Sequence, residues 1–220
     1  MVVIFILLLQ WVGFDSKSTY QDTMRHCFNN TSMIAFYFNY CISTGRDPFS
    51  NQEISWRAFC LQAVNPIEYD LLAKKGLSLE SPWDSEANVN ARGYVPYFYR
   101  CGLNVNCEDS AIVAVRSDRG VFSDNISKDD SDDNLVFIEI ANSGVNWLEP
   151  RDIDENELYA VTSNHVINGK DCIIIGMASG ICYVLTLENF LQVYPALVDV
   201  ASGKEITKKL DGRITTIVVR

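Results

Sequence analysis

The sequence predicts an α+β protein in which a long amino-terminal helix packs on a mostly antiparallel β-sheet. Three observations support this fold class. Apolar residues recur at helical spacing between residues 15 and 45, several short runs rich in Val, Ile, Tyr and Phe follow residue 93, and no helical pattern alternates with those runs. Strands that are separated by turns pair mainly antiparallel. The 220 residues suffice for one core with additions at its ends.

The first element is an uncharged segment, MVVIFILLLQWVGF, at residues 1–14. It is shorter than the roughly 18–20 residues that cross a bilayer as a helix. It also lacks a basic flank and an Ala-x-Ala cleavage site. We interpret residues 1–14 as an apolar membrane or export segment, and a buried core strand or helix is the alternative.

Residues 15–45 are predicted to form the amino-terminal helix, which lies along the sheet and ends near Gly45 and Pro48. Its inner face is expected to carry the apolar residues that follow three- and four-residue steps: Tyr20, Met24, Cys27, Thr31, Ile34, Phe38 and Cys41.

A second helix is expected over residues 55–75, and Pro66 should break or restart it. Its inner side is predicted to comprise Trp56, Phe59, Cys60, Ala63, Val64 and Leu71. The expected strands are residues 94–101, 111–116, 135–141, 172–177, 181–186 and a last edge strand at 213–219. Residues 178–180 read as a hairpin turn and residues 188–194 as a short helix.

Composition narrows the possible functions. Apolar residues make up 48% of the chain and charged residues 21%, which is typical of folded proteins. The net charge of −10 argues against a nucleic-acid partner, because such proteins normally carry a basic patch. The acidic segment at residues 123–134 lacks the EF-hand spacing, so a solvated loop is favoured over a calcium site.

Seven cysteines and two histidines give no metal or cofactor motif. There is no Cys-x-x-Cys, and His26 and His165 are far apart, so no zinc site is expected. Cys101 with Cys107, and Cys172 with Cys182, are possible disulfides, although buried thiols are commoner. Glycine-rich phosphate loops and nucleophile elbows are absent from the sequence, which favours a non-enzymatic protein that needs no cofactor. A hydrolase that uses His165 as its base is the enzymatic alternative.

Several peptides occur in one order along residues 25–190 and form a recognisable set. They are Cys27-x-Asn29-Asn30, Ser55-Trp56-Arg57, Pro82-Trp83-Asp84-Ser85 with Asn88, Pro96-x-x-Tyr99-Arg100-Cys101, and a block that contains Glu139, Trp147, Pro150 and Asp152, followed by His165. This set resembles the bacterial pilin-like proteins that carry the domain of unknown function numbered 1559. The prepilin cleavage motif of that family is not present here, and Ser179-Gly180 stands at its Asp-Gly turn.

The resemblance implies a pilin-like α+β domain at residues 46–195 behind the helix, with a carboxy-terminal extension at 196–220. It implies a non-enzymatic, pseudopilin-like component of the bacterial cell envelope, anchored in the inner membrane or exported, and linked to type II secretion or type IV pilus-like assemblies. Its expected partners are other pilin-like or envelope proteins and the membrane, which it contacts through residues 1–14.

The residue types of the motifs favour structural roles. Arg57 is expected to pair with a carboxylate, either Glu139 or Asp152, and thereby fix a loop. The tryptophans should cover the edge of the core. The alternative function is an exported binding module whose Trp83 and Trp147 loops hold a saccharide or peptide, which requires exposed indole rings.

Overall fold

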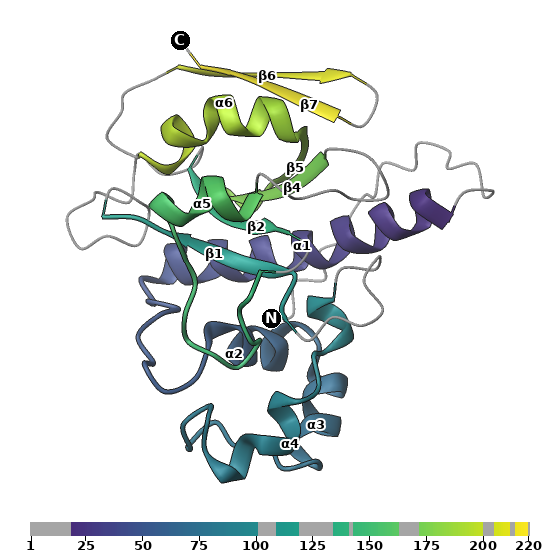
Figure 1. Ribbon diagram of the computed structural model, residues 1–220, viewed down its shortest axis with the longest axis vertical. Coiled ribbons are helices and arrows are strands. Elements are labelled where there is room, and N and C mark those ends of the chain that lie inside the picture. Colours follow the sequence, from purple (N-terminus) through teal and green to yellow (C-terminus); the bar gives the residue numbers. More distant parts are fainter. Residues whose placement is uncertain are drawn as a thin grey trace, which may run out of the picture.

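A five-stranded sheet with helices on both of its faces forms the centre of the protein (Figure 1). The computed structural model describes residues 19–100, 109–118, 134–140, 143–162, 172–199, 205–211 and 214–219. Its helices are α1 (Thr19–Thr44), α2 (Trp56–Val64), α3 (Pro66–Ala73), α4 (Val89–Arg92), α5 (Glu155–Thr162) and α6 (Leu187–Val198), with short 3-10 turns η1 (Glu86–Asn88) and η2 (Tyr97–Tyr99). The strands are β1 (Ile112–Arg116), β2 (Leu135–Glu139), β3 (Ile153–Asp154), β4 (Cys172–Met177), β5 (Cys182–Thr186), β6 (Ile206–Asp211) and β7 (Ile214–Val219).

The predicted α+β class and the mostly antiparallel sheet are confirmed. The strand order is β3-β1-β2-β4-β5, and β1, β2, β4 and β5 pair antiparallel, whereas the two-residue β3 lies parallel to β1. The turn at residues 178–180 joins β4 to β5 as predicted, and Gly180 adopts a φ of +83° that suits glycine.

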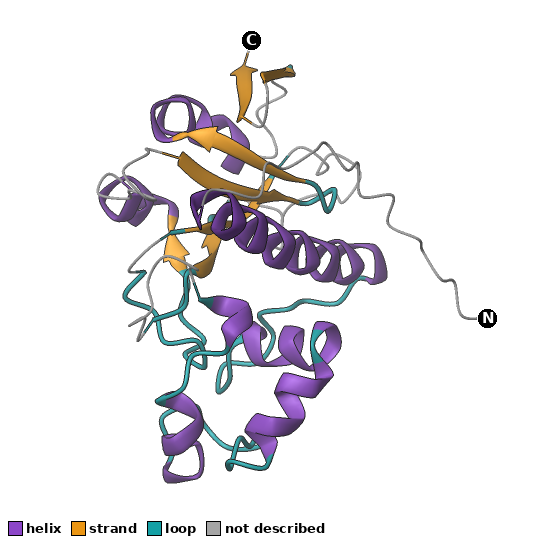
Figure 2. Ribbon diagram, turned by 90° about the vertical axis from the view of Figure 1, so that its right-hand side faces the viewer, coloured by secondary structure: helices purple, strands orange, loops and turns teal. Residues whose placement is uncertain are grey.

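Helix α1 lies along one face of the sheet, as the spacing of its apolar residues predicts (Figure 2). The expected inner positions with described side chains are all buried: Cys27, Thr31, Ile34, Phe38 and Cys41. The Thr31 hydroxyl donates to the Cys27 carbonyl oxygen at 2.9 Å, which lets a polar residue occupy a buried helix position.

The second face of the sheet is also covered, which the sequence did not predict. Helices α5 and α6 pack on it, opposite α1 (Figure 2). Every residue of β2 and β4 is therefore buried. Alternate residues of β4 serve the two sides, because Ile174 belongs to the core under α1 whereas Ile173 and Ile175 belong to the core under α6.

Residues 46–100 form a helical lobe below α1 that contains α2, α3 and α4 (Figure 1). The predicted break at Pro66 is confirmed, because Pro66 is the first residue of α3 and the Asn65 side chain caps that helix. The prediction that Leu71 faces inward is wrong, since it is 54% exposed and Leu72 is buried instead.

The strand predicted at residues 94–101 is wrong for the described residues 94–100. Residues Tyr97–Tyr99 form the 3-10 turn η2. Pro96 lacks an N–H for a strand ladder, and the neighbours Phe98 and Tyr99 are both buried, whereas a half-buried strand would alternate.

The carboxy-terminal region forms a separate hairpin in place of a last strand of the main sheet. Strands β6 and β7 pair with each other and pack near α6 and β5. The Asn189 side chain of α6 holds β7 at both backbone groups of Ile217, donating to its oxygen and accepting from its nitrogen at 2.9 Å each. Helix α6 is also longer than the predicted 188–194 and continues through Pro195.

The possible disulfide between Cys172 and Cys182 is not formed, and both cysteines are buried, which is the commoner state. The register places Cys172 opposite Thr186 and Cys182 opposite Gly176, so the two residues lie at opposite ends of the β4–β5 pair. The pair Cys101–Cys107 lies outside the described residues, as do residues 1–14 and the acidic segment 123–133.

Candidate functional site

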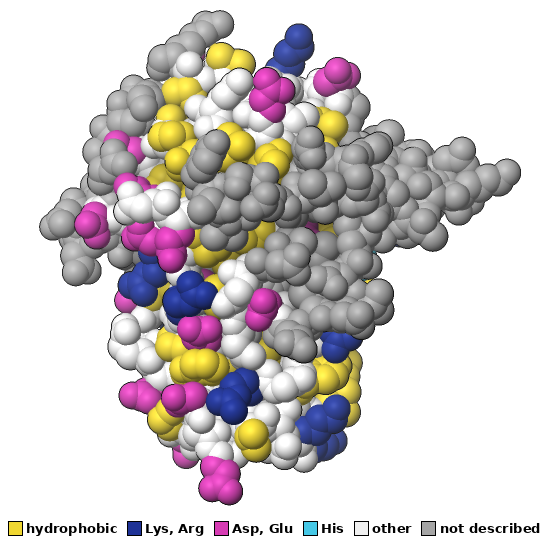
Figure 3. All heavy atoms as spheres, viewed as in Figure 1, with side chains coloured by type: hydrophobic (Ala, Val, Ile, Leu, Met, Phe, Trp, Pro, Cys, Tyr) yellow, Lys and Arg dark blue, Asp and Glu magenta, His cyan; other side chains and the backbone are white. Residues whose placement is uncertain are grey.

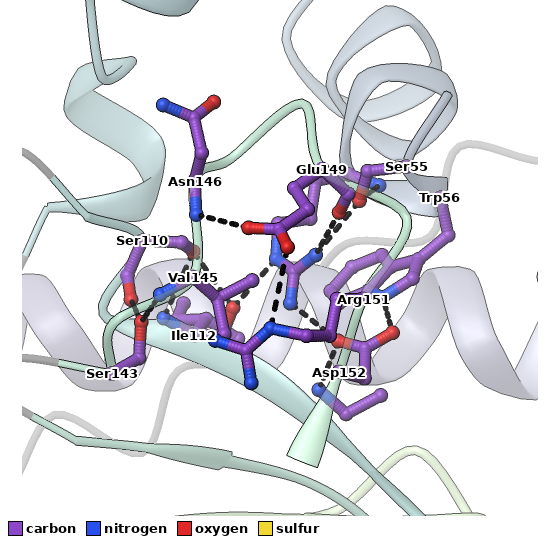
Figure 4. Close-up of polar contacts among 12 residues, drawn as sticks. Ser55, Trp56, Ser110, Ile112, Ser143, Val145, Asn146, Glu149, Arg151 and Asp152 are labelled. Atoms are coloured by element: carbon purple, nitrogen blue, oxygen red, sulfur yellow. Dashed lines mark hydrogen bonds and ion pairs between the residues drawn. The ribbon is translucent and has the colours of Figure 1, made fainter. Parts of the chain in front are cut away.

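The motif residues Arg57 and Asp152 form a fully buried ion pair. Figure 4 shows the Asp152 carboxylate beside the Trp56 indole. Both side chains of the pair are 0% exposed, and the Arg57 Nη2 contacts Asp152 Oδ1. This confirms one of the two partners predicted for Arg57. The other, Glu139, is 1% exposed on β2 opposite Ile112 and Ile174.

Two further groups donate hydrogen bonds to the Asp152 carboxylate. The indole Nε1 of Trp56 donates to Oδ2 at 2.9 Å, and the backbone amide of Ala114 donates to Oδ1 at 3.0 Å. Burial raises the pKa of the Asp152 carboxyl, and the neighbouring Arg57 guanidinium, the Ala114 amide and the Trp56 indole act in the opposite direction.

The guanidinium of Arg57 is tied to three further segments. Its Nε donates to the Ile112 carbonyl of β1 at 2.8 Å, and its Nη1 donates to the Ser55 hydroxyl at 2.8 Å and to the Glu149 carbonyl at 3.4 Å. The Ser55 hydroxyl also accepts from the Arg57 amide and so caps α2. The pair thus joins α2 to β1 and to the loop before β3.

The Pro82-Trp83-Asp84-Ser85 segment is organised by Asn88, whose side chain is 0% exposed. Its Oδ1 accepts from the Ser78 amide at 2.9 Å, and its Nδ2 lies 3.0–3.1 Å from the carbonyls of Ser78, Ser81 and Pro82. Pro82 and Asp84 are exposed and Trp83 is half-buried under the Arg92 guanidinium. The spacing between this segment and Asn88 therefore lets the Asn88 side chain hold the backbone of residues 78–82 in a closed loop.

Trp147 is 0% exposed, and its indole Nε1 donates to the Ala91 carbonyl at 3.0 Å. It stacks near Tyr99 with ring centroids 6.4 Å apart. A ligand-binding role that needs an open indole face is therefore unavailable to Trp147. Pro150 is half-buried in the same loop, between Glu149 and Asp152.

The motif on α1 divides into buried and exposed residues. Cys27 is buried, Asn29 is exposed and Asn30 is half-buried. The Asn30 Nδ2 lies 3.0 Å from His26 Nε2 and 3.2 Å from the Phe98 carbonyl, so it connects α1 to η2. Burial lowers the pKa of His26.

Two motif residues, Cys101 and His165, lie outside the described residues, so the hypothesis of a hydrolase based on His165 stays a prediction. Within the described part of the chain, no group of three or more His, Cys, Asp or Glu residues is arranged to hold a metal ion. Among the same residues, no helix has the length and apolar character needed to cross a membrane.

Sequence reasoning missed the structural role of Tyr99. Its hydroxyl donates to the Arg57 carbonyl at 2.7 Å, so it fixes α2 from the side of η2. Its place in the Pro-x-x-Tyr peptide was the available signal. Asn189, which holds the hairpin, had no signal in the sequence, because an asparagine in a helix predicts no contact with a particular strand.

Comparison of the chain with protein-family models, with curated proteins and with solved structures returns no match.

Proposed function

We propose that the protein is a non-enzymatic, pilin-like component of the bacterial cell envelope, related to pseudopilins of type II secretion or type IV pilus-like assemblies. The observation that supports the proposal most strongly is that the motif residues join separate parts of the fold. Trp56, Arg57 and Asp152 join the helical lobe to the sheet, and Asn30 joins α1 to that lobe. Structural roles of this kind explain why proteins with this set of motifs would share a fold, and they require no common reaction.

The chemistry of the central pair supports a structural role. Both charges are fully enclosed, and their hydrogen-bonding groups are directed at protein atoms on α2, β1 and the loop before β3. Removing one partner of such a pair leaves an uncompensated buried charge, which strongly favours retention of both residues.

The apolar segment at residues 1–14 supplies the proposed link to the membrane, and α1 leads from it to the sheet. The partners in this proposal are other pilin-like or envelope proteins, reached through protein contacts. Anchoring of this kind depends on buried apolar area at the membrane.

Fractionation of cells that express the full chain tests the proposal. The full chain should be recovered with membranes, and deletion of residues 1–14 should release it. A matched control is Phe36→Ser, which removes an apolar side chain that is 67% exposed on α1 and leaves residues 1–14 intact. Recovery of the intact chain away from membranes would contradict the proposal, as would release of the Phe36→Ser variant.

A further inference from the structure

Two cations converge on one tyrosine ring in the helical lobe. The Lys75 Nζ lies 4.6 Å from the centroid of the Tyr94 ring, and the Arg100 Cζ lies 5.1 Å from the same centroid. Lys75 follows the end of α3 and Arg100 follows η2. Cation–π contacts of this kind hold the two side chains in defined positions.

Neither cation has a carboxylate partner among the residues that the structure describes. The Arg100 Nε donates to the Val95 carbonyl at 2.7 Å, and its two Nη groups are left without a partner in the described ranges. The Lys75 ammonium makes only its contact with the ring there. In a chain with 28 acidic and 18 basic residues, two positioned cations without a carboxylate partner among the described residues are suited to binding an anion.

The charge of the chain is unevenly distributed. Residues 46–100 contain six basic and seven acidic side chains, so this lobe is almost neutral while the whole chain is at −10. On the face shown in Figure 3, the Lys and Arg side chains are gathered mainly over the lower half of the molecule. An anionic partner would therefore meet less repulsion at this lobe than at residues 101–200, which contain five basic and seventeen acidic side chains.

A second tyrosine, Tyr97, lies three residues before Arg100 in the chain. Tyr97 begins the turn that leads to Arg100, whose amide donates to the Tyr97 carbonyl at 3.3 Å. The Tyr97 ring is packed against His26 with centroids 4.2 Å apart, its amide donates to Glu68 Oε1 at 2.7 Å, and the side chain is still 58% exposed. The ring is thus fixed in place while much of its surface is open.

We propose that Lys75, Tyr94, Tyr97 and Arg100 form a binding surface for a uronic-acid polysaccharide. Tyr97 offers an apolar face to the C–H groups of a pyranose ring, and Lys75 and Arg100 bind the carboxylate of the sugar. A polymer with one carboxylate per sugar suits an acidic protein better than duplex DNA, which carries about one charge per 1.7 Å. This inference is independent of the envelope function proposed above.

Titration of the full chain with polygalacturonate, with neutral dextran and with a DNA oligonucleotide tests the proposal. Polygalacturonate should bind, binding should weaken as salt rises, and dextran and DNA should bind at least tenfold more weakly. Replacing Lys75 and Arg100 together by Gln should weaken polygalacturonate binding at least tenfold. The matched control is Arg46→Gln with Lys209→Gln, which removes the same charge from two exposed cations, one of them packed over Tyr40.

Tyr97 provides a second test that leaves both cations in place. Tyr97→Ala should weaken binding several-fold, whereas Tyr97→Phe should retain it, with the melting temperature showing that each variant is folded. The proposal is overturned by any of three results: no binding of polygalacturonate, equal weakening in the control double variant, or DNA binding as tight as that of the polysaccharide.

Discussion

The packing of Gly176 against Phe137 gives the sharpest prediction about this fold. Gly176 lies in β4, next to Phe137 of β2. A Cβ added at Gly176 would lie 2.1 Å from Cε1 and Cζ of the Phe137 ring, whereas carbon atoms at optimal separation are about 3.5–4.0 Å apart. The Gly176→Ala variant therefore forces the ring to move.

The Phe137 ring has little room to move, and this determines how far the free energy of unfolding falls. Phe137 is 0% exposed and stacks on Phe38 of α1, with centroids 5.8 Å apart. Overpacking costs about 1–3 kcal/mol, and a clash with a confined ring belongs at the upper end of that range. Alanine recovers about 0.5–1 kcal/mol of the cost of glycine in a strand. We expect Gly176→Ala to lower the free energy of unfolding by about 2 kcal/mol.

Urea denaturation followed by circular dichroism measures this loss. The control is Gly93→Ala, whose added Cβ meets its nearest atoms at 3.8 and 3.9 Å, so its free energy of unfolding should change by less than about 0.5 kcal/mol. Phe137→Leu should lower the free energy of unfolding less when it is made in the Gly176→Ala variant than when it is made in the native chain, because the smaller side chain makes room for the methyl group. A Gly176→Ala variant as stable as the native chain, or additive behaviour of the pair, would refute the reasoning.

Three other predictions concern polar groups that are buried or half-buried. Asp152→Ala should lower the free energy of unfolding by about 3–5 kcal/mol, since it leaves the Arg57 charge buried, and Arg57→Met with Asp152→Leu should cost less in the same urea experiment. Asn88→Ala should cost about 2–4 kcal/mol, because it removes four hydrogen bonds, and should speed proteolysis within residues 78–85. Burial lowers the pKa of His26 in the folded chain below its ordinary 6.5, so the unfolded chain binds the proton more tightly and the free energy of unfolding should fall as pH drops below that value. His26→Phe, which keeps a ring beside Tyr97, should reduce that slope between about pH 7.5 and 5.5.

Much of the fold was predictable because it depends on local periodicity. A run of β-branched residues identified β4, helical spacing identified the inner face of α1, which includes Phe38, and proline chemistry identified the break at Pro66. The face of α3 that is buried was not predictable, since Leu71 and Leu72 differ only through the direction in which the restarted helix leaves Pro66.

The partner of Arg57 illustrates the same limit for the candidate site. Residue type predicted a buried carboxylate, but the choice between Glu139 and Asp152 depends on how β1 and the loop before β3 meet. The exposed ring of Tyr97 was missed because a run of aromatic and β-branched residues reads as a strand. Only the position of His26 on a distant helix shows that this ring is fixed in place.

The helices on both faces of the sheet also affect how the chain can aggregate. Strand β4, Cys-Ile-Ile-Ile-Gly-Met, lies between β2 and β5 and contains six residues with no charge and no proline. Short segments of this composition stack into cross-β fibrils when they are exposed. Helices α1 and α6 therefore act as shields against self-association as well as parts of the core. Variants that loosen either helix are expected to aggregate from a partly folded state before the strands themselves unfold.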